Sequence, residues 1–282
     1  MYVTYKPLLF SLAYRMLGSV MDAEDMVQDI FLALDKVDTT RVTNVKAFLC
    51  KMVTNRCIDQ LRSARSKREV YVGPWLPEPL LTDVANGDPE SSAIMRDHLS
   101  LAYLTMMEKL TETERAVLVL REALAFDYPE IAEMTGKSEA NCRKILSRVK
   151  QKLGNESEEA SIPLEQHRQL VQDFLQAIVS GNVERVLSLL TKEAVLYSDG
   201  GGVVKAALNP ITTAERVALF LTGIAKKRPD SLWYQPAEVN GQPGFIGLID
   251  EQVHSVLSFK LKGNRIEEIY IMMNPEKLKH VK

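Results

Sequence analysis

A short segment near the middle of the chain carries side chains suited to contacting DNA. Residues 139–153 contain five Lys or Arg and one acidic residue, Glu139, for a net charge of +4. Arginine can pair with guanine, asparagine with adenine, and glutamate can accept a hydrogen bond from cytosine. The spacing of the apolar residues predicts an amphipathic helix with these polar groups on its exposed face. The residues expected to read bases, with the cap before them, are Ser138, Glu139, Asn141, Arg143, Lys144 and Arg148.

A second basic segment lies nearer the N-terminus. Residues 41–68 hold eight Lys or Arg and one acid, Asp59, for a net charge of +7. Apolar spacing predicts a helix over 44–63. Residues 69–135, between the two basic segments, carry four bases and thirteen acids, for a net charge of −9. Two basic helices separated by an acidic stretch indicate two contacts with a polyanion. The expected DNA-contacting residues of this first helix are Lys46, Lys51, Asn55, Arg56, Asp59, Arg62 and Arg65.

The total charge conceals this pattern. The 282 residues include 35 Lys and Arg against 37 Asp and Glu, a formal charge of −2. Taken alone, that balance argues against a nucleic-acid binder. The alternative that either basic run is only a solvated helix face stays open for each run by itself, but two amphipathic basic helices weaken it. Near-balance also predicts weak non-specific DNA binding by the free protein, because its acids oppose its bases.

Composition limits the class of protein. An apolar content of 46% and a charged content of 26% are typical of globular proteins and exclude wholesale disorder. No apolar run approaches the ~20 residues of a membrane span, so no membrane insertion is expected. The N-terminus keeps Lys6 and Arg15, and we expect no signal peptide there. Three cysteines, at 50, 57 and 142, are odd in number, indicating a reducing cytoplasm and buried packing roles.

Capping signals before the recognition segment predict a helix-turn-helix. Thr111 with Glu114 forms a capping box, and residues 127–130 supply an N-cap, a first-turn proline and a cap partner. Gly136 is expected to end that short helix, with Ser138 capping the next. A helix-turn-helix places its second helix in the major groove. The alternative is an ordinary helical hairpin with a basic surface.

An acidic helix precedes both basic segments. Residues 22–34 show the apolar spacing of one helix face, with Asp22, Asp25 and Asp29 on the opposite face. An acidic helix beside a basic helix could bind a protein on one side and DNA on the other.

This order of segments resembles the extracytoplasmic-function (ECF) sigma factors of bacterial RNA polymerase. Residues 22–32 are similar to the core-binding helix of region 2, and residues 45–49 and 55–62 to the part that melts and reads the −10 element. Residues 110–115 and the helix-turn-helix are similar to region 4, which reads the −35 element. The resemblance implies binding to the β′ and β subunits of core polymerase, to double-stranded promoter DNA and to the melted non-template strand. It implies no catalytic residue, metal or cofactor. The implied polymerase-binding residues are Asp22, Glu24, Asp25, Gln28, Asp29, Phe31 and Leu32.

Three further motifs, at residues 75–79, 199–202 and 274–278, are similar to those of one subgroup of this family. Members of this subgroup carry a fused SnoaL-like C-terminal domain. There the extension is implied to regulate the sigma factor in cis. Val203 stands where a lysine commonly follows the glycines. An exposed tryptophan between prolines is costly unless it docks, so we expect the linker around Trp75 to dock on the C-terminal domain. The interdomain residues are Trp75, Leu76, Pro77, Glu78, Pro79, Asp199, Gly200, Gly201, Gly202, Asn274, Pro275, Lys277 and Leu278.

The expected fold is multidomain: two all-α sigma domains, then an α+β cone with a curved antiparallel sheet and helices. Helices are expected near 163–179, 183–190 and 213–226, and strands close the chain. The expected boundaries are 1–70 for region 2, 71–91 for a Pro-rich linker, 92–154 for region 4 and 162–282 for the SnoaL-like regulatory domain.

Two other functions remain open at this point. One is a one-component regulator that joins a helix-turn-helix to a ligand-sensing domain, and a small-molecule ligand of the C-terminal domain also fits the main interpretation. The other is a SnoaL-like enzyme, which would need a converging acid–base pair. Its candidate residues are Asp199, Asp250, Glu251 and His254, and aromatic residues that could line its pocket are Trp233, Tyr234, Phe245 and Phe259.

Overall fold

The computed structural model describes the chain except residues 36–41, 43, 69, 83–98, 155–161 and 282, and it omits the side chains of 64–68. The chain divides into two compact units. Unit 1 comprises Met1–Val70, Val84–Leu99 and Tyr103–Ser157. Unit 2 comprises Tyr71–Asp83, Ser100–Ala102 and Glu158–Lys282. The first part of the expected linker therefore groups with the C-terminal domain.

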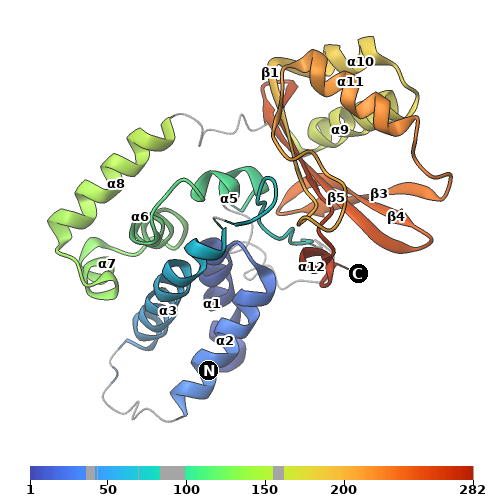
Figure 1. The fold of residues 1–282 in the computed structure, drawn as a ribbon. Coiled ribbons are helices and arrows are strands. Elements are labelled where there is room, and N and C mark those ends of the chain that lie inside the picture. Colours follow the sequence, from blue (N-terminus) through green and yellow to red (C-terminus); the bar gives the residue numbers. More distant parts are fainter. Residues whose placement is uncertain (36–41, 43, 69, 83–98, 155–161, 282) are drawn as a thin grey trace. The chain divides into compact units, whose positions relative to one another are not determined.

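Among its described residues, unit 1 is built from helices (Figure 1). Helix α3 runs five residues beyond the expected end at 63, and the segment after α6 continues as a π-helical turn, η2. The bounds are α1 Tyr2–Leu17, α2 Val20–Leu34, α3 Val45–Arg68, α5 Leu101–Met107 (which begins in unit 2), α6 Glu112–Leu118, η2 Val119–Ala123, α7 Tyr128–Thr135 and α8 Glu139–Leu153.

The capping residues act as their sequence positions predict. Ser19 accepts a hydrogen bond from the Asp22 amide at 3.1 Å. Capping boxes join Thr111 with Glu114 and Asp127 with Glu130. Each cap satisfies backbone N–H groups that a helix end leaves without partners. These short helices therefore begin at defined residues, which sets the angular position of the side chains that follow.

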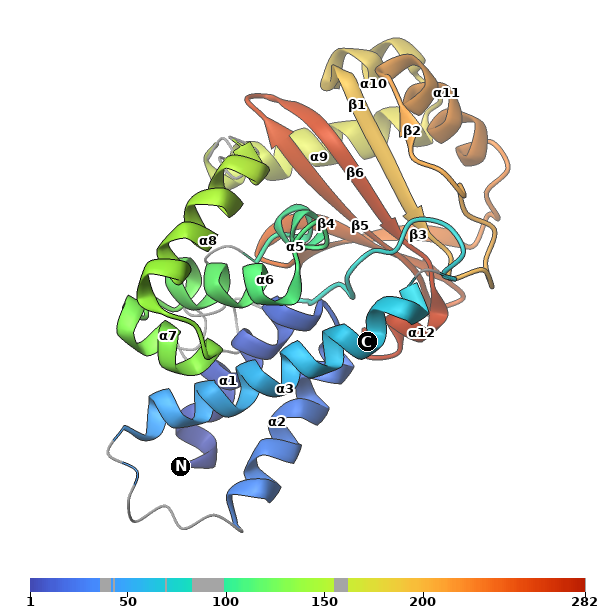
Figure 2. The same ribbon diagram turned by 60° about the vertical axis from the view of Figure 1, so that its left-hand side comes forward.

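Unit 2 combines helices with one six-stranded sheet (Figures 1 and 2). The strand order is β2-β1-β6-β5-β4-β3; β1 runs parallel to β6, and the other neighbours are antiparallel. The expected α+β architecture is confirmed, with a mixed sheet in place of a wholly antiparallel one. The bounds are α9 Leu164–Val179, α10 Val183–Leu189, β1 Leu190–Asp199, β2 Ile211–Thr212, α11 Ala214–Ala225, β3 Leu232–Val239, β4 Gln242–Ile249, β5 Gln252–Lys262, β6 Arg265–Met272 and α12 Pro275–Leu278.

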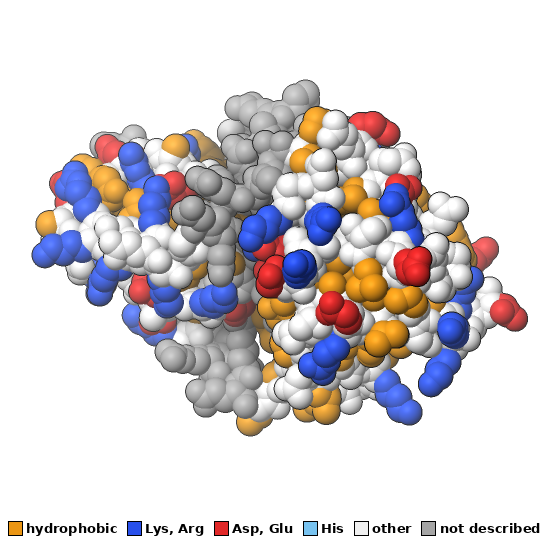
Figure 3. All heavy atoms as spheres, turned by 90° about the horizontal axis from the view of Figure 1, so that it is seen from above, with side chains coloured by type: hydrophobic (Ala, Val, Ile, Leu, Met, Phe, Trp, Pro, Cys, Tyr) orange, Lys and Arg blue, Asp and Glu red, His pale blue; other side chains and the backbone are white. Residues whose placement is uncertain are grey.

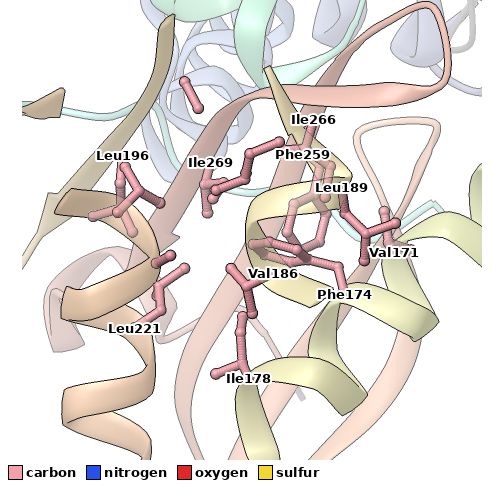
Figure 4. Packing of buried hydrophobic residues seen from close by; sticks show 14 of the residues in the cluster. Val171, Phe174, Ile178, Val186, Leu189, Leu196, Leu221, Phe259, Ile266 and Ile269 are labelled. Atoms are coloured by element: carbon pink, nitrogen blue, oxygen red, sulfur yellow. The ribbon is translucent and has the colours of Figure 1, made fainter. Parts of the chain in front are cut away.

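One face of the sheet packs against α9, α10 and α11 (Figure 4). Phe174 of α9 meets Phe259 of β5 edge to face, with ring centroids 5.9 Å apart, and Phe259 meets Phe245 in the same way. These aromatic side chains form the core rather than the lining of a pocket. Trp233, by contrast, is 49% exposed on the outer strand β3.

The opposite face is covered partly by segments from outside the sheet. Leu76 of the linker, Leu101, and Leu278 near the C-terminus pack in one buried cluster with side chains of β3 to β6. Alternation along β5 explains the two-sided core, because Val256 faces this cluster while Leu257 faces the helices. The linker is therefore part of the hydrophobic core of unit 2.

A buried histidine predicts how the stability of unit 2 depends on pH. Burial of His167 on α9 lowers its pKa from 6.5 to about 4, although its side chain hydrogen-bonds that of Gln242. Between those two values the unfolded chain binds a proton that the folded one does not, so stability falls as pH falls. We expect a loss of about 2 kcal/mol between pH 7 and pH 5 from this group. Urea unfolding of His167→Gln should show a correspondingly weaker pH dependence.

An unchanged pH dependence in His167→Gln would contradict the assignment of this effect to His167.

Candidate nucleic-acid interface and linker contact site

Helix α8 presents the expected base-reading residues on its exposed surface. The side chains of Asn141, Lys144 and Arg148, which are three and four residues apart, are all exposed. The opposite side, from Cys142 to Leu153, is buried at the positions the sequence predicts. Ser138 caps the helix by accepting from the Asn141 amide at 3.3 Å. Lys and Arg side chains gather over the end of unit 1 that carries α8, at the left of Figure 3.

The side chain of Arg143 is exposed as well, but it contacts two neighbouring side chains. Its guanidinium lies 4.4 Å from the ring centroid of Tyr128 and 3.3 Å from the carboxylate of Glu139. Stacking on an aromatic face and pairing with an acid both restrict an arginine. Asn141, Lys144 and Arg148 are therefore the better-placed group for base contacts.

Helix α3 places its basic residues beside α6 and α7 of the same unit. Lys51 lies 3.2 Å from Glu133 of α7, and Arg62 lies 3.0 Å from Glu112 of α6. Lys46 sits 5.0 Å from the ring centroid of Phe126. Asn55 and Asp59 are exposed and Arg56 is partly exposed, whereas the side chain of Arg65 lies outside the described residues.

The acidic face of α2 is open. Asp22, Glu24, Asp25, Gln28 and Asp29 are all exposed, and Leu32 beyond them is 65% exposed. Phe31 is partly buried, with its ring 4.7 Å from that of Tyr2. These exposed side chains are therefore accessible to a partner protein.

A buried arginine that the sequence did not reveal joins three segments of unit 1. Arg115 of α6 is 3% exposed and donates to the carbonyl oxygens of Met16 at 2.6 Å and Met107 at 2.8 Å. It also pairs with Glu108 at 2.9 Å. Burial lowers the pKa of Arg115 to about 10. The only sequence signal was an arginine on the inward side of an amphipathic helix, which by itself does not name its partners.

The linker contact site centres on Asp199, whose side chain is fully buried at the end of β1. One carboxylate oxygen accepts from the Tyr71 hydroxyl at 2.6 Å and from the Gly201 amide at 3.0 Å. The other accepts from the Leu76 amide at 2.9 Å and from Lys277 Nζ at 2.7 Å. Burial, together with the neighbouring Asp199, raises the pKa of the Tyr71 phenol. Four donors from three parts of the sequence, namely the linker, the glycine loop and the C-terminal segment, therefore satisfy one buried carboxylate.

Lys277 binds the linker at more than one point. Its ammonium donates to the Leu76 carbonyl oxygen at 2.5 Å and lies 4.1 Å from the Trp75 ring centroid. Asn274 donates to the Tyr71 hydroxyl at 2.8 Å and caps α12 by accepting from the Glu276 amide. The three motifs singled out in the sequence thus meet around one ion pair. Tyr71, which carries two of these hydrogen bonds, was not among the expected residues.

Glycine is required where the loop meets Asn274. Gly201 has a φ of +62°, and a Cβ at this position would clash with the side-chain amide of Asn274. A side chain would therefore be strained by its backbone and excluded by its neighbour. Val203 is 74% exposed, and the structure gives it no part in this site.

The rest of the linker adds to the sheet edge. The Thr82 amide donates to the Glu238 carbonyl oxygen at 2.9 Å, and the Asn240 amide donates to that of Leu80 at 2.7 Å. His280 hydrogen-bonds the carbonyl oxygen of Pro79 at 2.7 Å and lies 4.0 Å from the carboxylate of Glu78. Linker residues 71–82 are therefore held along their length within unit 2.

The candidates for acid–base catalysis do not form a free catalytic group. The Asp199 carboxylate is occupied by the four donors of the linker contact site, while Asp250 and Glu251 lie exposed in the β4–β5 turn. Among the described residues, no cluster of three or more His, Cys, Asp or Glu could hold a metal ion. Burial raises the pKa of the Cys50 thiol to about 12, which disfavours the reactive thiolate. Within the described chain, no helix is long and apolar enough to cross a bilayer.

Two family models and several known proteins are similar to this chain. A family model described as Sigma-70 region 2 matches residues 1–67, and one described as Sigma-70, region 4 matches residues 100–153. The chain is 32% identical over 239 residues to the ECF RNA polymerase sigma factor SigJ of Mycobacterium tuberculosis, covering 84% of this chain and 76% of SigJ. The chain belongs to the ECF RNA polymerase sigma factors. This family initiates transcription and is not enzymatic, so the catalytic interpretation is set aside.

The similarity of this ECF sigma factor to its relatives extends beyond the helical regions. It is 27% identical over 277 residues to the probable ECF sigma factor SigI of M. tuberculosis, covering 97% of this chain and 92% of SigI. The crystal structure of M. tuberculosis SigJ matches with a TM-score of 0.79 at 26% identity, covering 98% of this chain and 96% of that one. The fold of unit 2 is therefore shared with SigJ.

The linker contact site predicts a large effect of one charge on the stability of this sigma factor. Asp199→Asn leaves the Lys277 ammonium, whose side chain is 9% exposed, without its counter-ion. Removing one partner of a buried ion pair costs about 3–5 kcal/mol. Urea unfolding followed by tryptophan fluorescence should show this loss.

Asp250→Asn removes the same charge from an exposed turn where φ is +50°, a conformation that asparagine tolerates. This control should change stability by no more than about 0.5 kcal/mol. Equal losses in the two variants would contradict the role given to Asp199.

Proposed function

We propose that this ECF sigma factor uses three separate surfaces of unit 1 to start transcription. The exposed acidic face of α2 binds core polymerase, of which the β′ and β subunits are the expected partners. Helix α3 opens the −10 element and holds the melted non-template strand. Helix α8 reads the −35 element in the major groove. The observation that carries this assignment is the exposed row of Asn141, Lys144 and Arg148 on a capped recognition helix.

Run-off transcription with core polymerase alone tests this assignment. A promoter selected with the native chain should be transcribed, and Lys144→Ala/Arg148→Ala should lower its output about 10-fold or more, because each base contact contributes about 1–3 kcal/mol. The matched control, Lys226→Ala/Lys227→Ala, removes two exposed lysines from unit 2 and should leave output unchanged. Failure of the native chain to direct initiation with core enzyme would favour the one-component regulator.

We infer that unit 2 regulates the sigma factor in cis by holding the two ends of the linker. Residues 71–82 follow region 2 and residues 100–102 begin region 4, and both segments belong to unit 2. Leu76 and Leu101 pack in the same buried cluster. While both are held, the path between region 2 and region 4 is set by unit 2. Release of residues 71–82 would lengthen that path by the reach of an extended chain, about 3.3 Å per residue.

Promoters that differ in the spacing between the −35 and −10 elements test regulation by the linker. Asp199→Asn in the full chain should broaden the range of spacings that support run-off transcription, since the linker is released from one end. A chain ending after residue 165 should also change promoter output. The exposed variant Asp250→Asn should behave like the native chain. Unchanged output, spacing preference and polymerase affinity in both altered chains would contradict regulation in cis.

A groove beside α12 is open to a small molecule. An open groove of about 370 Å³ lies between the β4–β5 turn and the C-terminal segment. Pro275 and Leu278 of α12 line it, and the same short helix carries Lys277. Leu248 and Val253 give the groove an apolar wall, which fits the lining that ligand pockets usually have. A small molecule that entered this groove would contact the helix that carries Lys277.

A further inference from the structure

The acidic middle of the sequence meets the basic residues of α3 within unit 1. Lys51 Nζ lies 3.2 Å from a carboxylate oxygen of Glu133, and Arg62 Nε donates to Glu112 at 3.0 Å. Both bases belong to the face assigned to −10 DNA, and both acids belong to region 4. A base that pairs with a carboxylate is less available to a DNA phosphate, and Arg62 also lies 3.6 Å from Asp59 of its own helix.

The acids are held in place by rigid surroundings. Glu112 is the first residue of α6, whose start is defined by the Thr111–Glu114 capping box, and it is stabilised there by the helix dipole. Glu133 lies in α7, which the box at Asp127 and its first-turn proline define in the same way. The buried Arg115 ties α6 to the carbonyl end of α1. The two carboxylates therefore lie against α3 on helices whose positions are already fixed.

The two ion pairs are weak enough for DNA phosphates to replace the two carboxylates. The side chains of Lys51 and Glu133 are 40% and 74% exposed, and those of Arg62 and Glu112 are 58% and 23% exposed. Solvent-exposed pairs each contribute modestly and are screened by salt. A DNA strand offers a series of phosphates and releases counter-ions when it binds, so it can displace both acids.

We propose that Glu112 and Glu133 act as an internal competitor for −10 DNA, occupying Lys51 and Arg62 in the free protein. DNA binding at α3 and the contact of α3 with α6 and α7 then exclude one another. The free protein thereby avoids non-specific nucleic acid, and a nucleic acid that takes α3 also separates it from region 4. This inference rests on the proposed role of α3 in DNA contact.

Affinity for a short single-stranded DNA of mixed sequence provides the first test. The full-length double variant Glu112→Gln/Glu133→Gln should bind this probe about 3- to 10-fold more tightly than the native chain at low salt, since two exposed pairs no longer oppose it. The gain should shrink as salt is raised. The matched control, Glu184→Gln/Glu215→Gln, removes two exposed acids from unit 2 and should bind like the native chain. An equal gain in both double variants would overturn the inference.

A double-mutant cycle separates competition from simple repulsion of DNA by the two acids. In a Lys51→Met/Arg62→Met background the glutamate changes should have no further effect, because the pairs they break are already absent. A gain of the same size in that background would overturn the competitor role. If Lys51→Met/Arg62→Met by itself leaves DNA affinity unchanged, the proposed function of α3 fails, and the inference fails with it. If that variant weakens binding but the glutamate changes do nothing, only the inference fails.

Zero-length crosslinking tests the contact directly. A carbodiimide should join the Lys51 amine to the Glu133 carboxylate as an amide in the free protein, because the two groups lie 3.2 Å apart. Saturating single-stranded DNA should abolish this crosslink. The Lys262–Glu267 pair of unit 2, at 3.3 Å, is the internal control and should crosslink equally with and without DNA. A Lys51–Glu133 yield that DNA does not change would contradict competition.

Discussion

A buried carboxylate must be fully hydrogen-bonded, and the linker of this sigma factor is positioned by that requirement. Asp199 has no access to water, so each of its oxygens takes two donors from the protein. Those donors come from the linker, from the glycine loop and from Lys277 near the C-terminus. An ion pair of this kind contributes less to net stability than its Coulomb energy suggests, because both charges lose water. The four hydrogen bonds of Asp199 join the linker to the glycine loop and to Lys277.

Burial of apolar side chains supports the same placement. Leu76, whose own amide donates to Asp199, places its side chain in the core of unit 2, and Leu101 at the start of α5 enters the same cluster. Two segments between regions 2 and 4 of this ECF sigma factor are therefore part of the fold of its C-terminal domain. Under the proposed regulation in cis, a signal that changes α12 or the glycine loop would act on the connection between regions 2 and 4.

Charge is organised in unit 1 by a different principle. Its acids and bases are paired mostly at the surface, where each pair is weak and exchangeable. Two arginines differ from these pairs, because Arg15 and Arg115 are buried, and Arg115 bonds to the carbonyl oxygens of two other segments. Unit 1 thus combines one rigid internal junction with several contacts that a polyanion can replace. That division fits the proposed competition between the region 4 acids and DNA for α3.

The sequence by itself determined the helices, their caps and the two regions, because capping boxes and apolar spacing depend on residues three or four positions apart. It also indicated the three motifs of the linker contact site, through an exposed tryptophan between prolines and a run of glycines. Only the tertiary structure decided that these motifs meet at one carboxylate, that Tyr71 completes the site and that Arg115 binds the end of α1. It alone paired Lys51 with Glu133 across 82 positions. Such contacts depend on packing between distant segments, and no local spacing records which acid will face which base.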